Sequence, residues 1–276
     1  MLVRHCRALR RTTTVLIAST AVAGLSVTAP SSTAGSYTLD RRLEDSRINE
    51  SSGLARSTYS RDTLFTHNDS GDSARVFAVD PSGDTRAVFT LGGVRSRDAE
   101  DIAPGPRNTL WLGDIGDNGR VRDDIRVYRF TEPSTLSSRT VSATTYRFRY
   151  SDGRHNAEGL MVHPVSGRLY VVTKASSGAG IYAAPSTLST STVNRLTRVA
   201  PAPSLIKGAS FSPDGSRFVL SGGPYAYVYR SIGGTPVRLE KPPLEQGESV
   251  AVTRGGGTMV VGSEGADSPV YKLSMP

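Results

Sequence analysis

A pattern that recurs five times along the chain constrains the fold more than any other feature. Each copy combines small residues, a polar residue and an apolar residue, and successive copies are roughly 39 to 58 residues apart. The copies are ESSGLA from Glu50, DAEDIA from Asp98, NAEGLM from Asn156, KGASFS from Lys207 and QGESVA from Gln246. We align them on Leu54, Ile102, Leu160, Phe211 and Val250.

Each copy is followed by a tight-turn signal and two further short apolar runs, and four of the five copies have a fourth run. The last copy lacks its fourth run because the chain ends at Pro276, whereas a spare run, SYTLDRRL from Ser36, precedes the first copy. Pairing of this spare run with PVYKLSM from Pro269 would complete the last sheet and close the ring. The pattern predicts an all-β protein, a five-bladed β-propeller closed by its N-terminal strand.

The first 34 residues have the pattern of a secretory signal peptide. Four arginines, Arg4 to Arg11, precede an apolar stretch from Val15 to Val27, and small residues before Ala34 suit cleavage after that residue. An uncleaved N-terminal anchor and export through the twin-arginine route, suggested by Arg10 and Arg11, remain alternatives. We expect a secreted, extracellular protein with one propeller domain over residues 35–276.

The net charge and the cysteine content exclude several classes of function. The whole chain carries +8, but removal of the leader arginines leaves about +4, which is no signature of nucleic-acid binding. The only cysteine, Cys6, leaves with the leader, so the mature chain has no disulfide and no thiolate site. We expect no stable membrane insertion and a monomer.

Two loops rich in acids, amides and glycines, HNDSGD (67–72) and GDIGDN (113–118), both follow the second strand of a unit. Loops at this position of neighbouring blades open on the same face, so the two loops should lie side by side over the central channel. Such sequences also form ordinary tight turns, and this structural role is the alternative.

Glutamates at one register of the repeat suggest a metal site at the channel mouth. Glu100, Glu158 and Glu248 stand two residues before the aligned apolar position, where the other units have Ser52 and Ala209. Crowded carboxylates need a compensating charge, and oxygen ligands suit Ca²⁺. Asn68 and Asp114 are candidate further metal ligands. Alternatively, the glutamates cap backbone N–H groups, or Lys174, which we place in register with Asn68 and Asp114, supplies the countercharge.

Other polar residues near these loops are candidates for ligand binding or catalysis. No complete catalytic set is present: the sequence has no GxSxG elbow, no HExxH motif and no phosphate-binding loop. His155 and Lys174 are the candidates for catalysis. The candidate ligand-binding residues are His67, Asp69, Arg75, Asp117, Asn118 and Lys174.

Segments such as THNDSGD, DAEDIA, GDIGDN, HNAEGLM and QGESVA resemble the secreted bacterial β-propellers related to the "esterase-like activity of phytase" and WD40-like families. The resemblance covers nearly all of the mature chain. It implies calcium at the channel mouth and a phosphate ester as a substrate. The fourth unit departs from the pattern, because Ala209 occupies the position of the repeated acid.

Two hypotheses of function follow. In the first, the propeller is not an enzyme, and its acidic mouth binds a divalent cation, or a small anionic ligand, a glycan or an extracellular protein, or both a cation and such a partner. In the second, the protein is a calcium-dependent hydrolase of phosphate or carboxylic esters, in which the metal polarises the scissile group.

Overall fold

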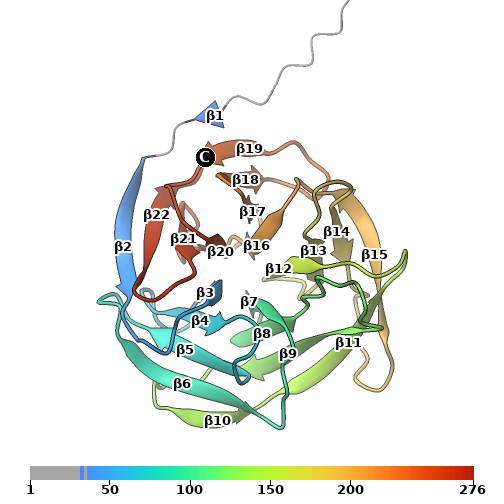
Figure 1. Cartoon of the computed structure of the whole chain (residues 1–276), viewed down its shortest axis with the longest axis horizontal. Coiled ribbons are helices and arrows are strands. Elements are labelled where there is room, and N and C mark those ends of the chain that lie inside the picture. Colours follow the sequence, from blue (N-terminus) through green and yellow to red (C-terminus); the bar gives the residue numbers. More distant parts are fainter. Residues whose placement is uncertain (1–31, 34–35) are drawn as a thin grey trace, which may run out of the picture.

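Short strands surround a central axis in the computed structural model, which describes residues 32–33 and 36–276 (Figure 1). Every regular element in that part of the chain is a β-strand, in agreement with the predicted all-β class. Within the same residues, a helix with the length and hydropathy to cross a membrane is not found. Of the predicted leader, only Ser32 and Thr33 are described, as the two-residue strand β1, and the rest lies outside the described residues.

The strands of the first three repeats form antiparallel four-stranded meanders. Their bounds are β3 (Ser51–Arg56), β4 (Leu64–Asn68), β5 (Arg75–Val79) and β6 (Thr85–Gly92); β7 (Ala99–Gly105), β8 (Thr109–Asp114), β9 (Ile125–Thr131) and β11 (Thr144–Tyr150); β12 (Ala157–Val162), β13 (Leu169–Thr173), β14 (Gly180–Ala183) and β15 (Asn194–Pro201). Each meander follows the order of turn signals and apolar runs in the sequence.

The last two repeats continue the same order. Their strands are β16 (Ile206–Phe211), β17 (Phe218–Gly222), β18 (Tyr225–Tyr229) and β19 (Val237–Glu240), then β20 (Gly247–Val252), β21 (Thr258–Ser263) and β22 (Ser268–Ser274). The strand β2 (Tyr37–Leu43) completes the last meander by pairing antiparallel with β22, from Tyr37 opposite Leu273 to Leu43 opposite Ser268. The predicted clasp between the two ends of the domain is therefore confirmed.

Parallel pairings between strands at the outer edges of the meanders make the number of sheets smaller than the number of meanders. The strands β11 and β15 pair in parallel, with Arg149 opposite Arg195, and this joins two meanders into one eight-stranded sheet. The short strand β10 (Arg139–Ser142) pairs in parallel with β6, and β1 with β19. Hydrogen bonding in the described residues thus gives four sheets, so the predicted count of five blades is not reproduced as five separate sheets.

The inner strands β3, β7, β12, β16 and β20 surround the axis (Figure 1). Each contacts the next along the chain, and β20 contacts β3, so the contacts close a ring. This radial arrangement is that of a β-propeller. Buried hydrophobic clusters fill the spaces between successive meanders, for example Trp111, Tyr146 and Leu160 between the second and the third. Burial of this apolar surface stabilises the ring, at about 25 cal/mol per Å².

The contribution of the clasp can be measured on two leucines of β2. Leu43 is fully buried in the cluster between the last and the first meander, whereas Leu39 is 52% exposed. We expect Leu43→Ala to lower the free energy of unfolding by about 2–5 kcal/mol, and the control Leu39→Ala to change it by less than about 0.5 kcal/mol. Urea denaturation measures both, and equal effects of the two substitutions would contradict a packed clasp.

Candidate functional site

A β-bulge at the start of every inner strand positions the residues at the end of the ring where these strands begin, which we call the mouth. The pairing with the second strand shifts register between Ala99 and Asp101, and the same shift occurs in the other units. Such a bulge re-aims one side chain out of the alternation of the strand. The residues at the shift are Ser52, Glu100, Glu158, Lys207 and, in the fifth unit, Glu248 together with Ser249.

The bulge corrects the predicted register in the fourth unit. Ala209 pairs with Leu220 as Leu160 pairs with Val171, so Ala209 is the equivalent of the aligned apolar residue and not of the acid. The position of the acid is occupied by Lys207. The predicted register of Lys174 also shifts by one residue, because Thr173 pairs with Ala157 at the end of β13. The ring therefore has a cation where the sequence alignment predicted a gap.

Three carboxylates from two neighbouring meanders converge at the mouth. One oxygen each of Asp69, Asp98 and Glu100 lies within 4.8 Å of the others. Asp69 follows β4, Asp98 precedes β7, and Glu100 occupies the bulge of β7. Gly116 lies directly against two of them, because a Cβ atom at this position would overlap the carboxylates of Asp98 and Glu100. The loops 67–72 and 113–118 therefore border the same carboxylates, as the sequence predicted.

The other two predicted glutamates have lysine partners. Lys174 forms an ion pair with Glu158, and Lys207 forms one with Glu248. Both glutamates are buried, while both lysines are about one quarter exposed. The predicted countercharge of Lys174 is thus present in the structure. None of the three converging carboxylates forms an ion pair with a side chain in residues 36–276.

Burial and mutual repulsion raise the pKa values of these acids. Burial, with the nearby charges of Glu158 and Asp69, raises the pKa of Glu100 to about 10. Burial raises the pKa of Asp69 to about 6. Burial also raises the pKa of Glu158 to about 7, although the hydrogen bond from Lys174 acts in the opposite direction. In the absence of a cation, Glu100 therefore keeps its proton at neutral pH, whereas Asp69 is mostly ionised and Glu158 is close to half ionised.

The two further candidate metal ligands have other partners. The carboxylate of Asp114 accepts hydrogen bonds from Arg122 Nη1 at 2.8 Å and from the Tyr128 hydroxyl at 2.8 Å. The amide of Asn68 accepts from the backbone N–H of Glu50 and donates to the carbonyl of Arg47 at 2.7 Å. These bonds hold the loops in place, so both residues have the structural role that the sequence left as an alternative.

Several ligand-binding candidates also have partners in the loops. The carboxylate of Asp117 accepts the backbone N–H groups of Val121 and Arg122, each at 2.9 Å, and so stabilises a turn. Asn118 accepts a hydrogen bond from Asn156 at 3.0 Å. Arg75 donates to Asp72 at 2.8 Å.

Within residues 36–276, neither histidine candidate has a hydrogen bond or an ion pair with the converging carboxylates. His67 is 1% exposed, its Nδ1 lies 2.8 Å from the carbonyl oxygen of Asn68, and burial lowers its pKa to about 4. His155 lies on a separate cluster, with its Nε2 3.1 Å from Asp152 and 3.2 Å from the Tyr182 hydroxyl. Of the predicted ligand-binding and catalytic residues, Asp69 belongs to the three-carboxylate group and Lys174 lies next to it, within the influence of Glu100.

Four residues at the mouth were not predicted from the sequence, namely Asp98, Asp101, Gly116 and Lys207. Asp98 and Asp101 flank Glu100 in the repeated segment, and this doubling of acids was the available signal. Asp101 is fully buried and accepts the backbone N–H groups of Leu160 at 2.8 Å and Ala209 at 3.1 Å. Its role is to join inner strands. The roles of Gly116 and Lys207 depend on spatial contacts that no motif reveals.

Comparison with known proteins supports the fold. No family model matches the chain, and no curated protein matches it in sequence. Among solved structures, a gluconolactonase of Xanthomonas campestris is 14% identical with a TM-score of 0.53, over 91% of this chain and 99% of that one. A PQQ-bound aldose sugar dehydrogenase of Streptomyces coelicolor is 12% identical with a TM-score of 0.50, over 89% of this chain and 99% of that one. At these identities the likeness shows a β-propeller fold.

The raised pKa values predict how stability depends on pH without a metal. Between about pH 5 and pH 8, the unfolded chain has already released protons that Asp69 and Glu158 retain in the folded state, so stability falls as the pH rises. In chelator we expect the melting temperature to decrease by a few degrees, on the order of 5 °C, across this range. Glu100→Gln should reduce the decrease, because Glu100 has a pKa of about 10 and so retains, across this range, a proton that the unfolded chain has released.

Thermal denaturation at several pH values tests this dependence, with Glu240→Gln as a control because Glu240 is exposed on β19. The expectation is wrong if the control flattens the pH profile as much as Glu100→Gln does.

Proposed function

We propose that this protein binds a divalent cation, with Ca²⁺ as the first choice, through Asp69, Asp98 and Glu100 at the mouth of a five-bladed propeller. The observation that carries the proposal is the convergence of three carboxylate oxygens within 4.8 Å of one another without an ion-pair partner in residues 36–276. Three anionic oxygens repel one another, and a hard cation that accepts oxygen ligands would offset this repulsion.

The five-blade count rests on two features of the inner strands. The contacts of β3, β7, β12, β16 and β20 close a ring, and every one of these strands begins with a bulge. On this basis the eight-stranded sheet comprises two blades, which the parallel pairing of β11 and β15 joins at their outer edges. The blades would then form one domain over residues 35–276.

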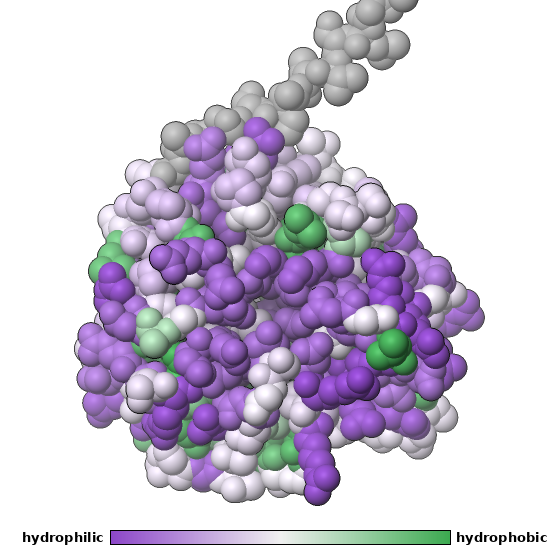
Figure 2. Space-filling model, viewed as in Figure 1, coloured by the Kyte–Doolittle hydropathy of each residue, from purple (hydrophilic) through white to green (hydrophobic). Residues whose placement is uncertain are grey.

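The charges around the cation site favour an anionic ligand or partner. Lys174 and Lys207 are half-buried beside the carboxylates and retain exposed surface. Ca²⁺ takes about six to eight oxygen ligands, so a cation held by three carboxylates would have positions left for an oxyanion or an acidic group of a glycan or protein. Hydrophilic residues dominate the face shown in Figure 2, which suits a polar partner.

The leader predicts where this function would operate. A secretory signal peptide cleaved after Ala34 would deliver the domain outside the cell, where Ca²⁺ is available at higher concentrations than in the cytoplasm. Cleavage there would also remove β1, while leaving β2 to complete the last meander. We keep an extracellular monomer as part of the proposal.

A pair of glycines in one loop provides a test that changes no charge. Gly116→Ala introduces a methyl group against Asp98 and Glu100, whereas a Cβ on Gly119 would make only ordinary contacts with Val121. We expect Gly116→Ala to weaken Ca²⁺ binding by about tenfold or more, equivalent to about 1.4 kcal/mol, and Gly119→Ala to leave it unchanged. Isothermal titration calorimetry measures both.

Circular dichroism and thermal denaturation establish that both variants are folded. The absence of Ca²⁺ binding by the unsubstituted protein, or equal affinities of the two folded variants, would rule out the proposed site.

Metal-dependent ester hydrolysis is a second candidate function, and the position of Glu158 favours it. Its pKa of about 7 suits a general base near neutral pH, and its charge interacts with that of Glu100 at the same mouth. Deprotonated Glu158 would accept a proton from a water that attacks the ester, and Lys174 would orient an anionic substrate. A bound cation would polarise the ester carbonyl or phosphoryl group.

The substrate class of this second candidate is an ester in the broad sense. The resemblance to phytase-like propellers points to phosphate esters. The structurally similar gluconolactonase is named for a lactone, which is a cyclic carboxylic ester.

Hydrolysis of p-nitrophenyl phosphate, p-nitrophenyl acetate and glucono-1,5-lactone, each with Ca²⁺ and with chelator, separates the two functions. If the protein is a hydrolase, one substrate turns over with Ca²⁺ only, and Glu158→Gln lowers the rate about 100-fold or more. The control Glu240→Gln retains the full rate. Tight Ca²⁺ binding without turnover of any of these esters would support the binding function alone.

A further inference from the structure

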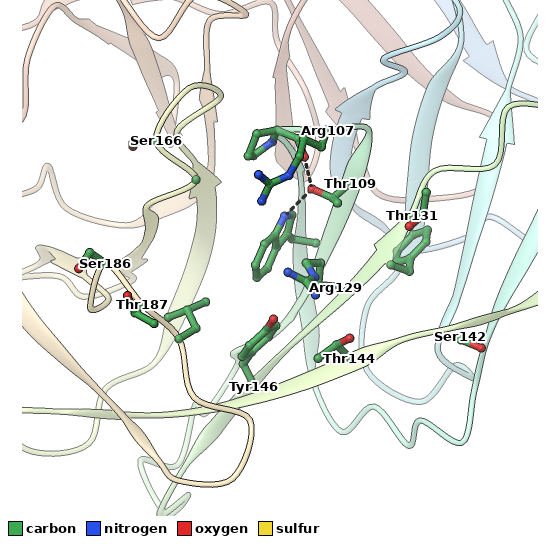
Figure 3. A pocket seen from close by; sticks show the side chains of 15 residues that line it. Arg107, Thr109, Arg129, Thr131, Ser142, Thr144, Tyr146, Ser166, Ser186 and Thr187 are labelled. Atoms are coloured by element: carbon green, nitrogen blue, oxygen red, sulfur yellow. Dashed lines mark hydrogen bonds between the residues drawn. The ribbon is translucent and has the colours of Figure 1, made fainter.

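A pocket of about 590 Å³ lies at the opposite end of β7 and β8 from the three carboxylates. The hairpin between these strands forms one wall, with Arg107 at its turn, and the loop between β14 and β15 forms another. Figure 3 shows Arg129 and Tyr146 in the centre, with Ser186 and Thr187 on the facing loop. Nothing in the proposed cation site uses this pocket.

Two aromatic rings hold the guanidinium group of Arg129. The rings of Trp111 and Tyr146 are stacked, with centroids 5.6 Å apart and planes inclined by 24°. The guanidinium carbon of Arg129 lies 5.6 Å from each ring centroid. The indole N–H donates to Thr109 at 3.1 Å, which fixes the orientation of the tryptophan. Cation–π attraction orients the guanidinium group but does not use its N–H donors.

The donors of both pocket arginines are available to a ligand. Among residues 36–276, neither Arg129 nor Arg107 has an ion-pair partner or a hydrogen-bond acceptor for its guanidinium group. Most other arginines of the same two meanders do have one: Arg122 pairs with Asp114 and Arg126 with Asp124. A preoriented guanidinium group with free donors is a receptor for an oxyanion, which it can bind through two parallel hydrogen bonds.

Hydroxyl groups surround the two arginines. Among the described residues these hydroxyls have no hydrogen-bond partner, so they can donate to or accept from a ligand. A lining of this kind matches a ligand that itself has many hydroxyl groups. The residues are Thr131, Ser142, Thr144, Ser186 and Thr187.

We propose that this pocket binds an acidic saccharide, a sugar ring with an attached carboxylate or sulfate group. The oxyanion bonds to Arg129 and Arg107, and the ring hydroxyls bond to the serine and threonine side chains of the walls. The volume of about 590 Å³ accommodates one to three sugar units. This site is independent of the cation site, because the two lie at opposite ends of β7 and β8.

The position of the only tryptophan in the sequence allows a direct test. Trp111 lines the pocket, so its fluorescence should change when a ligand contacts Arg129. The full-length mature protein is titrated with trigalacturonate, with its methyl ester, with galactose 6-sulfate and with sodium sulfate. We expect a saturable change with trigalacturonate or galactose 6-sulfate, and at least about tenfold weaker binding of the ester and of sulfate alone.

Substitutions locate the binding within the pocket. Arg129→Gln and Arg107→Gln should each weaken binding of the acidic sugar by about tenfold. The second variant guards against misfolding of the first, because Arg107 is exposed. Arg126→Gln is the matched control on the same strand, with an exposed side chain outside the pocket.

Three results would each overturn the proposal. The first is that neither acidic sugar gives a saturable change up to millimolar concentration. The second is that the methyl ester binds as tightly as trigalacturonate itself. The third is that Arg126→Gln weakens binding of the acidic sugar as much as Arg129→Gln and Arg107→Gln do. Persistence of sugar binding in Glu100→Gln, which removes a carboxylate of the cation site, would confirm that the two sites are separate.

Discussion

The buried carboxyl group of Asp101 is the contact on which the channel mouth depends. It accepts the backbone N–H groups of Leu160 and Ala209, which belong to the inner strands of the next two meanders. A buried N–H group without an acceptor costs about 1–3 kcal/mol, so this one side chain holds three inner strands in a common register. Its neighbour Glu100 occupies the bulge, and its direction toward the mouth therefore follows from the position of Asp101.

The bulges convert a repeated sequence into an asymmetric site. The five equivalent bulge positions carry a serine, three glutamates and a lysine, so the ring cannot have fivefold symmetry in charge. Lysines neutralise Glu158 and Glu248 on one side of the mouth, and the unpaired carboxylates gather on the other. The proposed cation would therefore lie among the unpaired carboxylates, next to the two lysine–glutamate ion pairs.

Opposite charges occupy the two ends of the second meander. Carboxylates gather where β7 begins, and the arginines of the pocket gather where the hairpin between β7 and β8 turns. The two strands that link them are buried, with Ile102 of β7 and Leu112 of β8 in the hydrophobic cluster against the first meander. A rigid element with different chemistry at each end would allow one propeller to bind the two ligands proposed above.

The sequence by itself determined the strand order, the closing role of the segment from Ser36 and the face on which the two polar loops meet. All three follow from apolar alternation and turn residues, which set strands and turns locally along the chain. Only the tertiary structure decided which acids converge. A bulge inserts one residue that the repeat pattern does not mark, so the alignment could not place Lys207 at the position equivalent to the glutamates. It also could not show that Asn68 bonds to the carbonyl of Arg47 and Asp114 to Arg122. The contact of Gly116 with Asp98 and the stacking of Arg129 on Trp111 and Tyr146 likewise depend on packing between segments, which no local pattern records.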